Sequence, residues 1–133
     1  MNTHQISKNT ASEANFQWLQ DMYTVIDQKD AKVWRTFLAE DATMNYANNP
    51  LVEGADQIIE NISHFFNSIQ ALNHSFLQIV EYEPNTFFIE WNVSYTRLDE
   101  KIVVLPATTL IKKNNQNLMT ELKVFIDVAP IYQ

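Results

Sequence analysis

The chain has 133 residues, of which 46% are hydrophobic, and 16 acidic against 9 basic side chains give a formal net charge of −7. A chain of this length can bury a real hydrophobic core, and the absence of cysteine excludes disulfide frameworks, thiolate zinc sites and thiol nucleophiles. The acidic balance argues against nucleic acid as a partner, because phosphate binding needs clustered Lys and Arg. A single glycine, Gly54, likewise excludes glycine-rich phosphate loops.

The longest apolar run, Ile102 to Ala107, is far shorter than the ~20 residues of a membrane helix. The first fifteen residues are polar and contain no apolar signal segment. We therefore expect a soluble, cytoplasmic protein with no membrane partner. Residues 1–11 carry no pattern and are predicted to be a disordered tail, so that a single domain spans residues 12–133.

Three helices are predicted in the first half of the domain. The first begins after Ser12 and ends near Gln28, because its apolar residues recur at helical spacing. Asp30 caps a shorter second helix with an apolar face that extends to Leu38, and Asp56 opens the third. A short strand at 42–46 and a loop that ends at Gly54 separate the second helix from the third.

After the third helix the apolar period changes from helical to two. Four strands are predicted, over residues 73–81, 86–98, 102–112 and 118–128, and the short turns between them make consecutive strands antiparallel. The element order is α-α-β-α-β-β-β-β. This order predicts an α+β fold in which three N-terminal helices pack on a curved, mainly antiparallel sheet that encloses a cavity.

The strand at 86–98 has two unlike faces. One carries Ile89, Trp91, Val93 and Tyr95, and the other carries Phe88, Glu90, Asn92 and Ser94. In one interpretation the mixed face lines the cavity, and the apolar face forms a homodimer through Trp91 and Tyr95 on the outer side of the sheet. In the other, the apolar face packs on the helices of its own subunit and the mixed face looks outward. The alternation itself fits both.

Several short motifs stand in a fixed order along this frame. They are Phe37-Leu38-Ala39-Glu40-Asp41-Ala42-Thr43, the loop closing with Gly54, the helix from Asp56, the strand from Trp91 to Arg97, Leu105-Pro106-Ala107 and Phe125-Ile126-Asp127-Val128-Ala129-Pro130. In this order they resemble the NTF2-like superfamily, specifically its SnoaL-like and ketosteroid-isomerase-like branch of cone-shaped α+β proteins. The resemblance implies the fold but not one reaction, because that fold hosts isomerases, cyclases, hydrolases, dehydratases and binding subunits.

The resemblance places few of the family's catalytic residues on this chain. Where ketosteroid isomerases have a general-base Asp, this chain has Tyr46; their oxyanion-hole Tyr falls on Met22 and their protonated acid falls near Thr109. SnoaL-type cyclases also need an acid on the strand of Thr109. Steroid isomerisation by that machinery is therefore not implied.

A local motif, Tyr46-Ala47-Asn48-Asn49-Pro50-Leu51, is similar to limonene-epoxide-hydrolase-like proteins, in which the Tyr and Asn hold the attacking water. The Arg and Asp of that family fall on Trp91 and Val93, and a further Asp falls on Val124. This register implies that Trp91 and Val93 point into the pocket.

The candidate catalytic residues are Glu90, Tyr46 and His74. Glu90 stands beside apolar neighbours that would raise its pKa and suit a general acid or base; the alternative is a solvated or ion-paired carboxylate. Tyr46 can orient water or a ligand carbonyl, and His74 can shuttle protons or be purely structural. The predicted pocket also includes Asn48, Asn92, Trp18, Met22, Thr109 and Val124.

The sequence thus predicts a pocket for a neutral small organic molecule, with hydration, isomerisation or cyclisation as the chemistry. The alternative is a binding or scaffold domain without chemistry, because the family's acids are replaced. The three histidines are too scattered to suggest a metal, and no cofactor is indicated.

Overall fold

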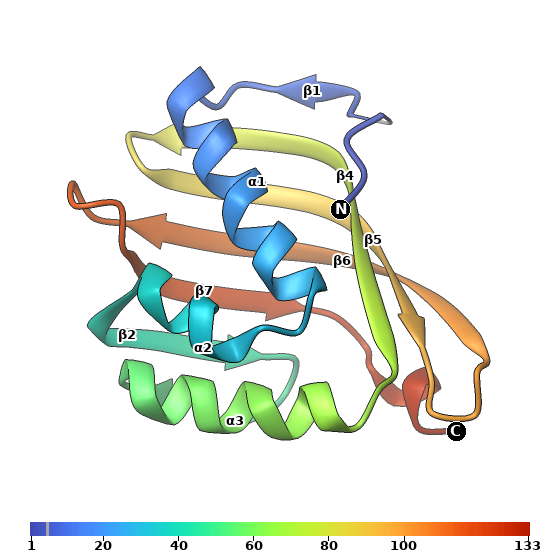
Figure 1. Ribbon diagram of the computed structural model, residues 1–133. Helices are drawn as coiled ribbons and strands as arrows, with labels where there is room; N and C mark the ends of the chain where they lie inside the picture. Colours follow the sequence, from blue (N-terminus) through green and yellow to red (C-terminus); the bar gives the residue numbers. More distant parts are fainter. Residues whose placement is uncertain (5) are drawn as a thin grey trace.

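A computed structural model, which describes residues 1–4 and 6–133, shows one curved sheet with helices on its inner side (Figure 1). The helices are α1 (Glu13–Asp27), α2 (Ala31–Trp34) and α3 (Ala55–Asn67), with 3-10 turns η1 (Arg35–Phe37) and η2 (Ala129–Ile131). The strands are β1 (Lys8–Asn9), β2 (Leu38–Tyr46), β3 (Val52–Glu53), β4 (Ala71–Glu83), β5 (Thr86–Thr96), β6 (Ile102–Lys113) and β7 (Met119–Phe125). The predicted α+β architecture is confirmed.

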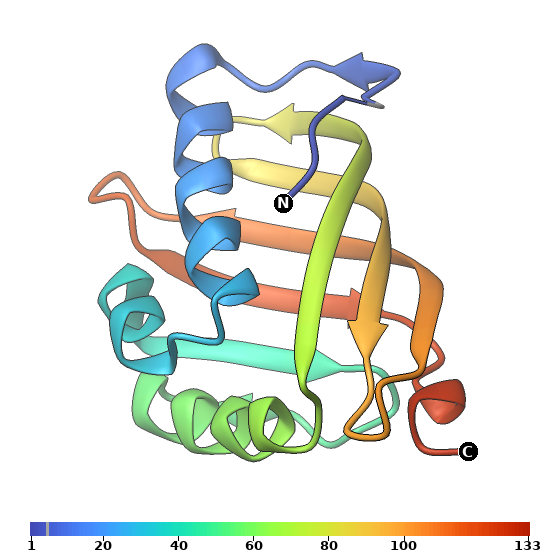
Figure 2. The same ribbon diagram turned by 45° about the vertical axis from the view of Figure 1, so that its right-hand side comes forward.

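The sheet has the strand order β1-β4-β5-β6-β7-β2-β3. The strands β4 to β7 are consecutive antiparallel neighbours, as their short connections predict. β2 joins the far side of β7 in parallel, so the first long strand of the domain pairs with the last. Strands β4, β5 and β6 bend strongly, and the sheet wraps around α1 (Figure 2). The pairing of β4 with β5 shifts between Phe76 and Gln78, and such an irregularity is a common cause of strand bending.

The start of β2 differs from the sequence-based expectation. The second helix was expected to reach Leu38, but α2 ends at Trp34 and β2 begins at Leu38. Leu38 pairs with Met119 of β7, so sheet hydrogen bonding replaces the helix there. Both Trp34 and Leu38 are still buried, which explains why their spacing resembled one helical face.

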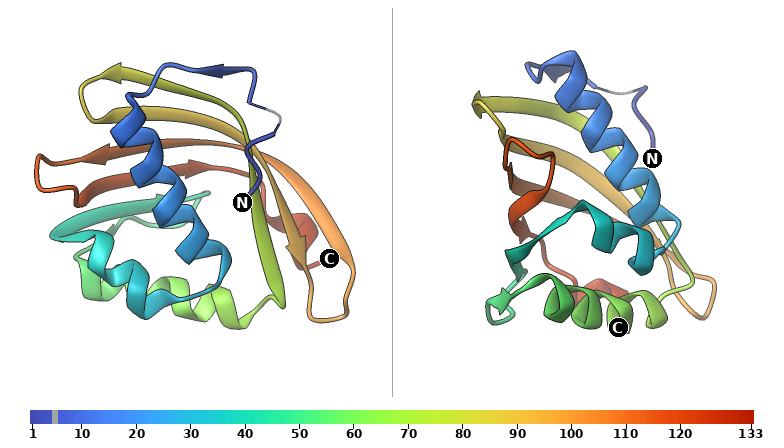
Figure 3. Two further views of the ribbon diagram at one scale, coloured as in Figure 1. Left: turned by 45° about the horizontal axis from the view of Figure 1, so that its top comes forward. Right: turned by 60° about the vertical axis from the view of Figure 1, so that its left-hand side comes forward.

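The polar N-terminal segment, expected to be disordered, follows the outer edge of the sheet (Figure 3). Lys8 and Asn9 form β1 and pair in parallel with Gln78 and Ile79 of β4. The amide of Ser7 also donates to the Leu77 carbonyl at 2.7 Å. The segment therefore satisfies backbone groups that an uncovered edge strand would leave open, while the side chains of Lys8 and Asn9 stay exposed.

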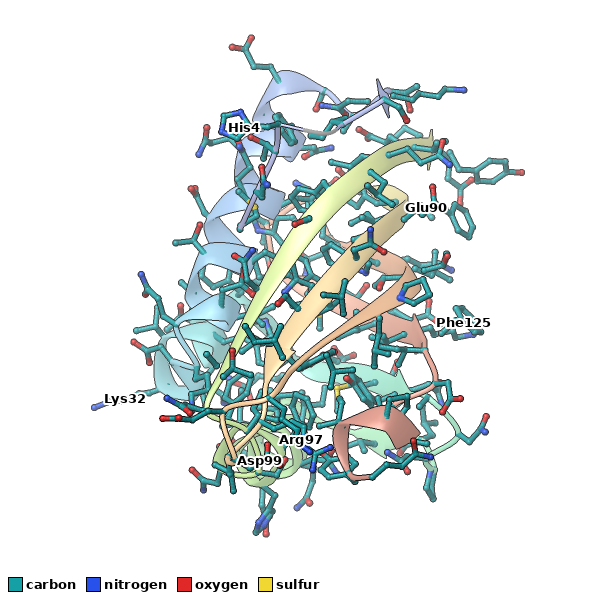
Figure 4. All side chains as sticks on the ribbon, turned by 90° about the vertical axis from the view of Figure 1, so that its right-hand side faces the viewer. His4, Lys32, Glu90, Arg97, Asp99 and Phe125 are labelled. Atoms are coloured by element: carbon teal, nitrogen blue, oxygen red, sulfur yellow. The ribbon has the colours of Figure 1, made fainter. Side chains whose placement is uncertain are left out.

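The two faces of β5 are assigned by burial. Trp91 and Tyr95 are 1% and 2% exposed and point toward the helices, so the apolar face packs on its own subunit. The interpretation that placed these two side chains in a dimer interface is therefore wrong. Figure 4 shows Glu90 and Phe125 on the opposite side of the sheet, away from the helices. Among the helices in the described part of the chain, none is long and apolar enough to cross a membrane.

Candidate functional site

An apolar cavity lies between α1, α2, α3 and the inner face of the sheet. Its volume is about 40 Å³, which corresponds to about three water molecules at roughly 10–15 Å³ each. Aromatic and aliphatic side chains form most of the wall; the polar members of the wall are Tyr23, Tyr46, His74, Tyr95 and Thr109. The wall of the inner cavity is therefore apolar with a few hydrogen-bonding groups, and this kind of lining is typical of small-molecule sites.

One polar group of the wall is a histidine held by a carboxylate. His74 lies on β4, and Asp27 is the last residue of α1. A hydrogen bond of 2.6 Å joins His74 Nδ1 to Asp27 Oδ1. The second carboxylate oxygen of Asp27 accepts the backbone N–H of His74 at 3.0 Å. These bonds fix the imidazole, and Nε2 has no hydrogen-bond partner within residues 1–4 and 6–133.

The Asp27 carboxyl is ionised at neutral pH. Burial is the largest influence on its pKa and raises it, but the hydrogen bonds and charge of His74 oppose burial and leave the pKa below its ordinary value. The amino group of Met1 also lies 3.1 Å from Asp27 Oδ2. Asp27 is thus a buried negative charge beside the imidazole.

A second polar group is a pair of tyrosines. The hydroxyls of Tyr46 on β2 and Tyr95 on β5 lie 3.2 Å apart. Burial raises the pKa of Tyr46 to about 12. Burial, reinforced by Tyr46, raises the pKa of Tyr95 further above its ordinary range. Both hydroxyls therefore stay protonated at neutral pH, and the hydroxyl that accepts within the pair keeps its own proton for a ligand oxygen.

A third tyrosine approaches the same wall from α1. Tyr23 is 3% exposed, and its ring meets those of His74 and Trp91 at centroid distances of 4.8 and 4.3 Å. Burial and then the charge of Asp27 raise the pKa of its hydroxyl well above the ordinary value. This hydroxyl makes no hydrogen bond among the described residues, so it is available to a ligand.

Two tryptophans complete the cavity wall. Trp91 donates its indole N–H to Thr109 Oγ1 at 3.1 Å, and both side chains are buried. Thr109 is thereby used in packing. The indole nitrogen of Trp34 is buried without a hydrogen-bond partner in the described part of the chain.

The structure brings together four of the predicted site residues. His74, Tyr46, Thr109 and Val124 all line the inner cavity. They come from β4, β2, β6 and β7, so the sheet itself assembles them.

The other predicted residues lie elsewhere. Glu90 is exposed on the outer face, where its carboxylate accepts a hydrogen bond from Gln78 at 3.0 Å, and Asn92 shares that face. Because side chains alternate between the two faces along β5, Glu90 and Asn92 lie on the face opposite to that of Trp91. Asn48 is exposed in the turn after β2. Trp18 and Met22 are buried in the core outside the cavity wall, and Trp18 donates to the Asn117 carbonyl at 3.0 Å.

The sequence analysis assigned neither Tyr23, Tyr95 nor Asp27 to the site. Of these, Asp27 had a signal in its position. It follows Tyr23 by four positions, so it continues the apolar stripe of α1 toward the core. The available signal was a carboxylate on the buried stripe of a helix. It was missed because acidic residues near a helix end usually lie on the surface.

These features define an NTF2-like α+β cone with an apolar cavity. The model of the SnoaL-like domain family matches residues 19–121, and the chain belongs to that family. No curated protein matches the chain.

Solved structures similar to this chain support the same fold. An NTF2-like protein of unknown function from Burkholderia pseudomallei has a TM-score of 0.77 at 15% identity, over 90% of this chain and 95% of that one. A Shewanella putrefaciens protein described as a SnoaL-like polyketide cyclase has a TM-score of 0.75 at 19% identity, over 88% of this chain and 92% of that one. A third similar structure is a Catenulispora acidiphila protein with a ketosteroid isomerase-like fold, in complex with trimethylamine. Its TM-score is 0.76 at 13% identity, over 86% of this chain and 88% of that one.

Proposed function

We propose that this protein binds a small neutral organic molecule in the inner cavity and moves a proton on it, with His74 as the acid or base. The observation that carries the proposal is the Asp27–His74 hydrogen bond of 2.6 Å at the cavity wall. An imidazole fixed through Nδ1 by a carboxylate presents Nε2 to the ligand, and the carboxylate stabilises the imidazolium that forms when Nε2 takes a proton.

The tyrosines supply the second half of this chemistry. When a base removes a proton next to a carbonyl, negative charge develops on the carbonyl oxygen. The hydroxyl of the Tyr46–Tyr95 pair that accepts from its partner keeps its proton, and it can donate to this oxygen together with the Tyr23 hydroxyl. The site has low polarity, where such hydrogen bonds are strong. The reaction class is therefore proton transfer at a carbon next to a carbonyl, as in isomerisation or cyclisation.

A neutral ligand suits the cavity and the molecule as a whole. Most of the wall is apolar, Asp27 already provides one buried negative charge, and the net charge of −7 repels anions at long range. A solved relative in complex with trimethylamine, at 13% identity, supports small-molecule binding by this fold only in general terms.

The test uses acetone, a neutral ketone of a size comparable to the inner cavity. In D₂O, transfer of a methyl proton from acetone to His74 Nε2 gives an enolate and an imidazolium. The Nε2 proton then exchanges with D₂O, and return of the deuteron from Nε2 to the enolate carbon restores the neutral imidazole and labels the methyl group. Proton NMR follows the loss of the methyl signal. We expect His74→Gln to lower the protein-dependent exchange rate by about 100-fold, the lower end of the usual general-base contribution. Asp27→Asn should lower it less, because the amide oxygen can still accept from Nδ1.

His4→Gln is the matched control, since His4 is an exposed histidine away from the cavity. It should exchange acetone at the wild-type rate. Equal rates for wild type and a folded His74→Gln would overturn the proposed chemistry. That result would favour the binding domain without chemistry. The supporting observations are the small apolar cavity and the Trp34 indole, whose N–H has no hydrogen-bond partner within residues 1–4 and 6–133.

We also infer that two copies associate through the outer face of the sheet. Phe88, Val104 and Phe125 are 44%, 58% and 62% exposed there, on the neighbouring strands β5, β6 and β7. Apolar side chains gathered on one exposed face commonly mark an interaction surface. The cytoplasmic location expected from the sequence stays a prediction.

A further inference from the structure

A second pocket adjoins the inner cavity on its outward side. This outer pocket has a volume of about 370 Å³, and it is lined by Tyr46, Asn49, Asn61, Ile62, His64, Phe65, Ser68, Val128 and Tyr132. It lies between the second half of α3, the turn after β2 and the C-terminal segment with η2, which the Ser68–Tyr132 hydroxyl contact of 3.0 Å joins to α3. Figures 1 and 2 show the C-terminal turn on the same side of the molecule as the end of α3.

The two spaces share a wall. Tyr46, Ile62 and Phe65 line both the inner cavity and the outer pocket. The Phe65 ring lies 5.6 Å from that of Tyr46 and 5.9 Å from that of Tyr95, measured between centroids. Phe65 is only half-buried, so its ring has room to turn toward solvent. A ligand longer than acetone would extend past Phe65 from the tyrosine pair into the outer pocket.

The chemistry of the two spaces is different. The inner cavity is almost wholly apolar, whereas the outer pocket presents the amides of Asn49 and Asn61 and the hydroxyls of Ser68 and Tyr132. Its described lining contains no Lys, Arg, Asp or Glu, and its titratable side chains are His64, Tyr46 and Tyr132. Glu53 and Glu60 line the neighbouring surface groove together with Asn61 and His64, so their charge disfavours an anion at this edge.

We propose that the outer pocket is a second subsite for the same ligand and that it takes a neutral hydrogen-bonding group, such as an amide or hydroxyl, at the end of a short chain. The substrate is then a ketone with an apolar stem and a neutral polar end. This inference rests on the proposed function for the position of the ketone, and it adds the part of the ligand that determines specificity.

Three methyl ketones of matched shape test the subsite. They are 5-oxohexanamide, whose end is neutral and polar, 5-oxohexanoate, whose end is anionic, and 6-methylheptan-2-one, whose end is apolar. Isothermal titration gives the affinity of each for wild type, for Asn61→Leu and for the control Asn67→Leu, since Asn67 is exposed on α3 outside the pocket. We expect wild type to bind the amide most tightly and the carboxylate least tightly.

Asn61→Leu should weaken binding of the amide by about fivefold, the usual size for one net hydrogen bond. It should leave 6-methylheptan-2-one unchanged, and Asn67→Leu should change neither. Nuclear Overhauser contacts between the amide end of the ligand and the Asn61 side chain would support the same placement. Both substitutions are at exposed helical positions, so both variants should fold.

The outcomes separate this inference from the function on which it rests. If acetone exchange depends on His74 but the amide binds no better than 6-methylheptan-2-one, the subsite is overturned and the proposed function stands. An effect of Asn67→Leu equal to that of Asn61→Leu would also overturn the subsite. If wild type neither exchanges acetone nor binds any of the three ketones, both are overturned.

Discussion

Asp27 Oδ1 and His74 Nδ1 lie 2.6 Å apart although the two residues are 47 positions apart in the chain. The first ends α1 and the second stands near the start of β4, so this bond ties the helical layer to the sheet as well as orienting the imidazole. The proposed proton transfer and the stability of the fold therefore depend on the same carboxylate.

Removal of the Asp27 charge should destabilise the protein in a pH-dependent way. Because the pKa of Asp27 is lower in the folded state, its stabilisation is present above the unfolded value of about 4 and is lost as pH falls through the folded pKa. Urea unfolding should show Asp27→Asn less stable than wild type by about 1–3 kcal/mol near neutral pH, with the difference shrinking below about pH 4. The matched control is Asp21→Asn at an exposed position of α1, and an equal loss there would contradict the assignment.

The tyrosine pair predicts a late alkaline titration. Absorbance of the wild type minus that of Tyr46→Phe should show tyrosinate only near pH 12, because burial raises the pKa of Tyr46 to about 12. The raised pKa of Tyr46 also determines how stability changes with pH. Its contribution to folding stability is fully present below the tyrosine pKa of the unfolded chain, about 10, and is lost as pH rises through the folded-state pKa.

At neutral pH, Tyr46→Phe should cost about 1 kcal/mol in free energy of unfolding, since it leaves the Tyr95 hydroxyl without its partner. Tyr82→Phe, at a side chain that is 73% exposed, serves as the control and should leave stability unchanged. A difference spectrum for Tyr46 that is complete near pH 10 would show that its hydroxyl is solvated.

Glu90 should be dispensable for proton transfer. It lies on the outer face with Gln78, on the opposite side of the sheet from His74. Glu90→Gln is therefore expected to exchange acetone at the wild-type rate and to unfold at the same urea concentration. Loss of exchange in this variant would restore the sequence-based choice of Glu90 and reject the inner cavity as the site.

The outer face should control the oligomeric state. Phe125→Glu places a charge at a side chain that is 62% exposed, so the monomer should fold normally while a dimer through this face separates. Sedimentation equilibrium measures the mass of the wild type, of Phe125→Glu and of the control Leu51→Glu, whose site is an exposed loop. A dimer that persists in Phe125→Glu, or a monomeric wild type, would contradict the proposed dimer through the outer face of the sheet.

The sequence predicted the helices and the antiparallel strands well because each has a clear apolar period of its own. It did not decide the faces of β5, since Phe88 and Trp91 stand on opposite faces and alternation does not say which one the helices cover. It also missed β1, whose pairing depends on backbone groups and not on side-chain pattern. Among site residues, Tyr46 and His74 were found from their chemistry. Asp27 was not, because only the fold brings the end of α1 to β4.

The parallel pairing of β2 with β7 has a consequence for how the protein is made. Tyr46 lies on β2 and Val124 on β7, and these two residues are direct partners in the ladder. Pairings so distant in sequence form late, because the closure entropy of the intervening chain must be overcome first. During synthesis the ribosome must release the chain through β7 before this wall can close. Until then the aromatic lining is exposed to solvent, and a chaperone would meet it at that stage.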